Sequence, residues 1–210
     1  MTVWTISAQP GTPGEAAARE LATIAGVPLY DREGFAAMAE DLDIEVPALD
    51  RIEERFCGRH ALGLALASGM GGAAPVRELQ LKQALPDLGR RLMSEVARGP
   101  CVIAVPAAFA ALADHPAALH ARLRAPFDWR VEAYRREHLV DRHRAEKELK
   151  HADHLQHAWV RMLYHVDAED DSRYAIVLDA SRLSPVRVAE ALLGAGGGVA
   201  SLPAKTGSLG

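Results

Sequence analysis

The sequence predicts an α/β fold with three layers, α/β/α, around a mainly parallel five-stranded sheet. Short, apolar and β-branched stretches such as Val3–Ser7 and Cys101–Val105 are typical of strands that are covered on both faces. Segments with helical spacing of apolar residues alternate with these strands, and this alternation produces parallel strands joined by helices. Ligands of such sheets bind at the carboxyl ends of the strands, so residues that follow a strand are the candidates for a functional site.

Residues 1–193 are expected to form one domain, because a chain of 210 residues can bury a single core. Further strands are predicted just before Asp31, at Leu119–Leu123 and at Arg173–Leu178. Helices are predicted at Gly14–Ala25, Arg32–Glu40, Pro47–Phe56, His60–Ala67, Val76–Arg98, Phe109–Asp114, Phe127–Glu137, Asp141–His165 and Val186–Leu193. Asp31 and Ser184 are typical N-caps, and the small, polar residues 194–210 predict a flexible tail.

Composition narrows the class of protein. The net charge of -4 argues against a general nucleic-acid binder, which is usually basic. Cys57 and Cys101 lie far apart without metal-type spacing, which favours buried free thiols in a reducing cytoplasm. The sequence shows no basic-then-apolar leader and no long apolar span, so neither export nor membrane insertion is expected.

The segment Gln9–Glu15 connects the first strand to the first helix through prolines and glycines. Backbone N–H groups in such a turn, with the partial positive charge of a helix N-terminus, form an anion site that usually holds phosphate. The turn is not a Walker A loop, since Glu15 stands at the lysine position and Ala16 at that of the magnesium-binding hydroxyl. The alternative to phosphate binding is that these glycines serve only to form the turn. The candidate phosphate-binding residues are Gly11, Thr12, Pro13, Gly14 and Glu15.

The run 3–33 resembles the cytidylate kinase-like family. In that family a strand leads to a Gly-Ser-Gly-Gly-Arg-Glu turn, a helix and then Gly-x-Pro-x-Tyr-Asp-Arg-Glu, which Gly26-Val-Pro-Leu-Tyr-Asp-Arg-Glu33 matches. Further matches are Arg122-Leu-Arg-Ala-Pro126 with Arg130, Lys150-x-x-Asp153 and the ending Tyr174-Ala-Ile-Val-Leu-Asp-Ala-Ser-Arg-Leu-Ser184. The resemblance extends from about residue 3 to 193. It implies a P-loop nucleotide-kinase fold with an acceptor-side helical insert at 47–98 and a lid helix within 138–165.

The resemblance also implies a function, the transfer of phosphate from ATP with Mg²⁺ to a nucleoside monophosphate of the CMP type. Lys150, Asp153 and Arg161 are then the catalytic candidates, and Asp31, Arg32 and Arg130 the acceptor-binding candidates. Asp31 and Arg32 have an alternative role as a cap and a surface charge. Arg122 and Arg124 either reach phosphate or pair with carboxylates, and pairing is favoured for Arg122, whereas proximity to ligand is favoured for Arg130.

The sequence departs from the family pattern at positions that the resemblance places in the phosphate-binding and catalytic site. Glu15 replaces an arginine, Val105-Pro106-Ala107 replaces Gly-Arg, and His154 replaces a lid arginine. A like charge about 4 Å from phosphate costs roughly 1 to 4 kcal/mol, which weakens binding by about one to three decades unless Glu15 turns outward. The alternative function is therefore a catalytically degenerate relative that senses nucleotides or binds a protein partner or a second copy of itself.

Three histidines, His151, His154 and His157, recur at every third position in the polar helix. Neighbouring members of this set could share a metal ion with Asp153 nearby, but no cysteine joins them and a closed structural site needs about four ligands. A solvated polar face is the favoured interpretation, and no metal site is predicted. A lid that responds to pH is a further alternative, because histidine titrates near neutrality.

Overall fold

A computed structural model of the chain describes residues 2–31, 33–34, 86–87 and 89–197. These residues form a five-stranded sheet in the order β2-β3-β1-β4-β5, and every pair of neighbouring strands is parallel. The strands are β1 (Val3–Ala8), β2 (Leu29–Tyr30), β3 (Cys101–Ile103), β4 (Ala118–Arg124) and β5 (Ile176–Asp179). The parallel sheet agrees with the predicted fold class.

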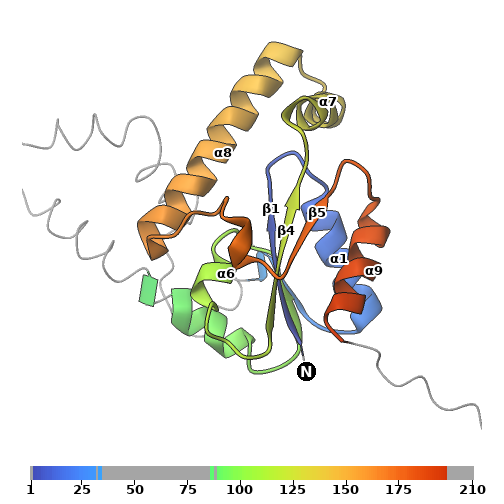
Figure 1. The fold of residues 1–210 in the computed structure, drawn as a ribbon. Helices are drawn as coiled ribbons and strands as arrows, with labels where there is room; N and C mark the ends of the chain where they lie inside the picture. The colour runs from blue at the N-terminus through green and yellow to red at the C-terminus, as the bar shows by residue number, and fades with distance from the viewer. Residues whose placement is uncertain (1, 32, 35–85, 88, 198–210) are drawn as a thin grey trace, which may run out of the picture.

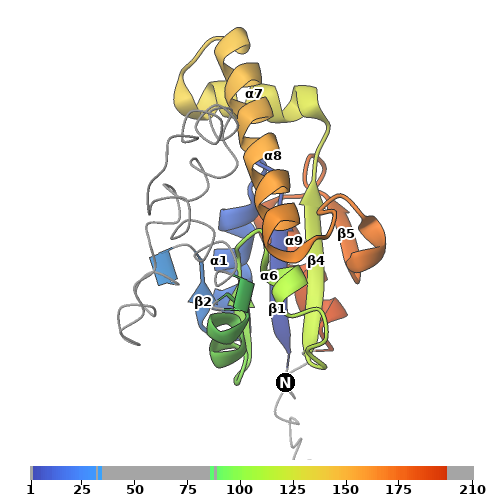
Figure 2. The same ribbon diagram turned by 90° about the vertical axis from the view of Figure 1, so that its left-hand side faces the viewer.

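Helices cover both faces of the sheet (Figures 1 and 2). The helices α1 (Gly14–Ala25) and α9 (Pro185–Ala195) pack together on one face. The other face is covered by α6 (Ala108–Ala111), by α8 (Arg142–Tyr164) and by helical residues 89–96. The helix α7 (Phe127–His138) follows β4 beyond the carboxyl end of the sheet and packs against the first half of α8. The three-layer arrangement follows from the two covered faces.

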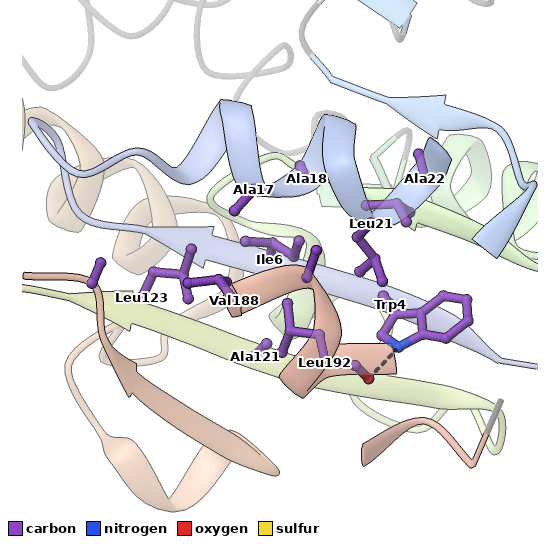
Figure 3. Close-up of a cluster of buried hydrophobic side chains, with 13 residues drawn as sticks. Trp4, Ile6, Ala17, Ala18, Leu21, Ala22, Ala121, Leu123, Val188 and Leu192 are labelled. Carbon is purple, nitrogen blue, oxygen red and sulfur yellow. Dashed lines mark hydrogen bonds between the residues drawn. The ribbon is translucent and has the colours of Figure 1, made fainter. Parts of the chain in front are cut away.

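The core alternates along β1, because successive side chains of a strand point to opposite faces. Trp4 and Ile6 pack under α1 and α9, where Leu21 and Leu192 also lie (Figure 3). The Trp4 Nε1–H donates to the Leu192 carbonyl oxygen at 3.0 Å, which satisfies the buried indole. Val3 points to the opposite face, and so this short strand contributes to the cores on both sides of the sheet.

Several predicted elements are confirmed. Helix α1 has the predicted bounds, and α7 and α9 agree to within two residues at each end. The Ser184 hydroxyl caps α9 by accepting from Arg187 N, and Asp31 Oδ1 accepts from Gly34 N at 3.0 Å, which confirms both N-caps. Cys101 is free, and burial raises the pKa of its thiol to about 11, in keeping with an inert cysteine.

The predicted strand Arg173–Leu178 is wrong at its start. Residues Asp171–Arg173 form a short 3-10 helix, and β5 begins only at Ile176. The Asp170 carboxylate accepts from both Ser172 N and Ser172 Oγ, and this local turn holds the backbone out of the sheet. Similarly, β3 ends at Ile103 rather than at Val105, and α6 ends at Ala111 rather than at Asp114.

Other predictions lie outside the described residues. These are Arg32, Cys57, the helices Pro47–Phe56 and His60–Ala67, most of the helices Arg32–Glu40 and Val76–Arg98, most of the insert 47–98, and the tail from residue 198. Residues 194–197, at the start of the predicted tail, belong to the end of α9 and the turn after it. The lid helix stays a prediction.

Candidate phosphate-binding site

The candidate site lies where the strand order reverses. β1 sits between β3 and β4, so the chain leaves the carboxyl end of β1 at the switch point of the sheet. Connections on the two sides of such a point diverge to opposite faces and leave a crevice in which α/β proteins bind ligands. The loop 9–13 starts in this place and leads to the N-terminus of α1. Topology alone therefore places the predicted phosphate loop where a ligand is expected.

Gln9 anchors the loop to the neighbouring strand. Its N–H donates to the Leu123 carbonyl at 2.9 Å, and its side-chain Oε1 accepts from Ala125 N at 3.1 Å. Its own carbonyl accepts from the N–H and the hydroxyl of Thr12, at 3.1 and 2.6 Å. Sequence reasoning gave Gln9 no role, because the partner of its side chain, Ala125, follows a strand that is distant in the sequence. The Thr12 hydroxyl and N–H are both used inside the turn.

Two glycines allow close approaches that other residues would prevent. A Cβ on Gly14 would lie 2.2 Å from the Ala8 Cβ, so only glycine lets α1 begin this close to β1. Gly11 has a φ of +79°, and a Cβ there would lie 2.9 Å from Leu149 Cδ2 and 3.3 Å from Arg130 Cβ. Backbone conformation and close packing thus explain why both residues are glycine, without a role in ligand binding.

The loop has fewer backbone donors than a phosphate cradle usually offers. Pro10 and Pro13 have no N–H, and the Thr12 N–H is already bonded. Pro13 is also the N-cap of α1 and makes no side-chain capping bond. The remaining donors are the N–H groups of Gly11, Gly14, Glu15 and Ala16, at the positive end of the α1 dipole. This set can still attract an anion.

Helix α8 covers the loop with one face. Leu149, Asp153 and Gln156 are spaced at i, i+4 and i+7, so they point to the same side of the helix. Leu149 lies over Gly11, and Gln156 Nε2 donates to the Ala8 carbonyl at 3.1 Å. Asp153 lies between them and binds Arg130. The region predicted as a lid is therefore in contact with the loop.

Arg130 is the basic side chain that reaches the loop. Its side chain is 5% exposed. Nη1 and Nη2 donate to the two carboxylate oxygens of Asp153 at 2.8 and 3.1 Å, and Nη1 also donates to the Pro10 carbonyl at 3.0 Å. Nε is buried and has no partner among the described residues. The structure thus brings together Arg130 and Asp153, which were predicted to serve different functions, and pairs their charges.

Lys150 and Arg161 are exposed on α8. Lys150 Nζ lies 5.5 Å from the centroid of the Phe127 ring, and the Arg130 guanidinium lies 5.3 Å from the same ring. Neither Lys150 nor Arg161 is paired with a carboxylate of a described residue. Glu15 is exposed in the first turn of α1, which reduces the repulsion expected between its carboxylate and a bound phosphate.

The sequence matches the model of the cytidylate kinase-like family over residues 3–182. The chain belongs to the cytidylate kinase-like family. Membership supports a nucleotide kinase-like function, because the match includes the loop, α7 and α8. A comparison with curated proteins found no match.

Solved structures with TM-scores above 0.5 agree with this fold. An uncharacterized protein from Eubacterium ventriosum matches with a TM-score of 0.63 and 16% identity over 92% of this chain and 97% of that chain. The protein TT1252 from Thermus thermophilus matches with a TM-score of 0.52 and 20% identity, covering 92% of this chain and 95% of its own. A shikimate kinase from Bacteroides thetaiotaomicron matches with a TM-score of 0.49 and 12% identity over 92% and 97% of the two chains.

Within this family, the residues around the loop decide whether the chain can hold Mg²⁺ itself. Ala16 offers no hydroxyl, both oxygens of Asp153 bind Arg130, and Asp31 Oδ1 caps the next helix. Among the described residues, no group of three or more His, Cys, Asp and Glu could hold a metal ion. Ala16 and Asp153 therefore offer no free side-chain oxygen for Mg²⁺ at the loop.

Arg122 belongs to a network beside the site. Its side chain is buried and donates to the Glu169 carbonyl at 2.8 Å and to Asp171 Oδ1 at 2.6 Å. Arg124 binds the other oxygen of Asp171 at 2.8 Å. The prediction that Arg122 pairs with carboxylates at the surface is confirmed, since both acidic partners are exposed while Arg122 itself is buried. The acidic turn 167–171 was the available signal in the sequence.

The three histidines of α8 do not come together on a ligand. His157 Nε2 lies 3.6 Å from Glu169 Oε1, and His154 is exposed.

Among the described residues, no helix is both long and apolar enough to cross a membrane.

Proposed function

We propose that this chain binds the phosphate groups of a nucleotide at the loop 9–15 without transferring them. Family membership and the place of the loop at the switch point support nucleotide binding. The N–H groups at the start of α1 provide the donors. The protein is then a nucleotide sensor, and α8, which touches the loop, is the element that responds to the ligand.

The pairing of Arg130 with Asp153 is the observation that carries this proposal. Phosphoryl transfer depends on cationic groups aimed at charge that develops on the phosphoryl oxygens. The guanidinium that reaches the loop is neutralised by Asp153, and Glu15 stands at the position where a Walker A loop has its lysine. Backbone donors and a single arginine can hold phosphate, but without the lysine of a Walker A loop they supply little of the stabilisation that transfer requires.

Calorimetric titration of the purified chain tests the proposal. ATP is titrated with Mg²⁺ and with EDTA, and CMP is titrated separately. We expect ATP to bind in both conditions, because the N–H groups of the loop contact phosphate directly. ADP formation is then measured with ATP, Mg²⁺ and CMP together. Absence of ATP binding at millimolar concentration overturns nucleotide binding, and ADP formation dependent on CMP overturns the non-catalytic part.

A second candidate is transfer of phosphate from ATP with Mg²⁺ to an acceptor of the CMP type. The exposed Lys150 and Arg161 favour it, because neither cation is engaged by a described carboxylate. This candidate predicts that Lys150→Ala and Arg161→Ala each abolish CMP-dependent ADP formation while ATP still binds. Retention of full turnover in both variants would exclude these residues as the catalytic cations.

A further inference from the structure

The contact between α8 and the loop is built around one ion pair. Leu149 packs over Gly11 at one end of the contact, and Gln156 holds the Ala8 carbonyl at the other. Asp153 lies between these two contacts, and its side chain is 23% exposed. It binds the guanidinium that also holds the Pro10 carbonyl. Asp153 thus places a negative charge beside the loop where a phosphate is expected to bind.

Arg130 is incompletely satisfied in this arrangement. A guanidinium has five N–H donors, and the buried Nε of Arg130 has no partner among the described residues. Arginine binds carboxylate and phosphate with the same two-pronged geometry. A phosphate at the loop would therefore compete with Asp153 for the same guanidinium, and it brings more acceptor oxygens than a carboxylate does.

We propose that Asp153 is an internal competitor for the phosphate that Arg130 binds. Nucleotide binding then exchanges the carboxylate for a phosphate at Arg130 and loosens the contact of α8 with the loop. This inference rests on the proposed function, and it assigns Asp153 a different role from the catalytic one that the family resemblance implies. Asp153 acts through Arg130 and is a positioning residue.

The test is ATP affinity, measured by calorimetry in EDTA with the full chain. Asp153→Asn keeps the shape of the side chain and removes its charge, so we expect ATP to bind at least about tenfold more tightly than to the wild type. Arg130→Gln should lose most of the affinity.

Glu146→Gln is the matched control. Glu146 lies on the same helix and pairs with Arg142 Nε at 2.8 Å, so this variant also removes one negative charge and one ion pair from α8. It lies two turns before Asp153, and we expect its ATP affinity to stay within about twofold of the wild type, because exposed charges at that separation are screened. An equal gain in both variants would indicate a general charge effect and overturn the inference.

Asp153→Asn leaves Arg130 without its counter-ion, so its folding is checked by circular dichroism. If the variant is unstable, thermal unfolding is followed in inorganic phosphate and in sodium chloride of equal ionic strength. Phosphate that fills the vacant position should raise the melting temperature of Asp153→Asn more than that of Glu146→Gln. Equal stabilisation of the two variants would overturn the inference, since phosphate also stabilises proteins generally.

Amide hydrogen exchange provides a second readout. ATP should increase amide hydrogen exchange in residues 149–156 of the wild type, because replacement of Asp153 by phosphate at Arg130 releases α8 from the loop. Wild-type binding without a gain in Asp153→Asn would overturn this inference and leave the proposed function intact. Failure of the wild type and both variants to bind ATP would overturn the proposed function as well.

Discussion

The side chain of Leu149 lies next to the position that a Cβ atom on Gly11 would occupy. A Cβ on Gly11 would be 2.9 Å from Leu149 Cδ2, closer than such atoms approach in real structures. Gly11 also has a φ of +79°, which side chains of L-residues rarely tolerate. Two independent constraints, one of backbone and one of packing, therefore require glycine at the centre of the loop.

Gly11→Ala should lower the free energy of unfolding by more than the strain of a positive φ alone. The strain costs about 1–2 kcal/mol, and the contact with Leu149 adds to it. Equilibrium denaturation in urea measures the effect. Adding Leu149→Ala to Gly11→Ala removes the clash, so the two changes should interact in a double-mutant cycle.

Gly26→Ala is the control for the backbone part of this prediction. Gly26 has a φ of +65°, and a Cβ there would meet no atom within 4 Å. Its substitution should therefore cost only the strain, about 1–2 kcal/mol. Equal costs at Gly11 and Gly26 would show that Leu149 does not press on the loop.

Arg122→Met should destabilise the protein more than Arg124→Met does. The Arg122 side chain is 7% exposed and holds two acidic residues of the turn, whereas that of Arg124 is 53% exposed. We expect losses of about 1–3 kcal/mol for Arg122 and of about 0.5 kcal/mol or less for Arg124, measured by urea denaturation. ATP affinity should be unchanged in the folded Arg122→Met variant. A large loss of affinity would instead indicate that Arg122 contacts the ligand.

Stability should fall as the pH is lowered from about 7 to 5, in part because of His120. Burial lowers the pKa of His120, and its Nδ1 shares a hydrogen bond with Thr5 Oγ1 at 2.8 Å. Below the ordinary pKa of about 6.5, the unfolded chain binds the proton more readily than the folded chain does, so the free energy of unfolding decreases. Above it both states are neutral, and this contribution is constant.

The variant His120→Asn tests that assignment by urea denaturation at several pH values. It should flatten the decrease in stability between about pH 7 and 5, since the titrating group is gone. Identical pH profiles for His120→Asn and the wild type would assign the effect to other groups.

Glu15→Arg should strengthen ATP binding by up to about tenfold at low ionic strength. The new charge would lie at the first turn of α1 near the free N–H groups, where a phosphate is expected. Because the side chain is exposed, the gain should shrink as salt is added. Glu20→Arg makes the same change of charge farther along α1, and a gain of equal size there would show that Glu15 has no special position.

Much of the local structure could be predicted from the sequence. The passage from β1 through the loop to α1 follows from an apolar strand, a proline–glycine turn and a helical apolar stripe, all encoded by neighbouring residues. The start of β5 could not be predicted in this way, because Arg173 and Tyr174 look like strand residues. The Asp170–Ser172 turn competes for their backbone.

The candidate site shows the same division. The residues near the loop could be named from their places after strands and from the family resemblance. The partners of these residues could not be predicted, because they lie far apart in the sequence. Arg130 and Asp153 are 23 positions apart, and Gln9 and Ala125 are 116 positions apart. Arg130, expected to contact a ligand, has two partners within the chain that the sequence did not reveal, Asp153 and the Pro10 carbonyl.

The order of the elements, the family and the position of the loop at the end of β1 follow from the amino-acid sequence, since each depends on local pattern or on motif spacing. The contact of α8 with the loop and the pairing of Asp153 with Arg130 are visible in the folded chain alone. Such contacts depend on how helices cross and on which face each presents, and these are set by packing of the whole core rather than by any one segment.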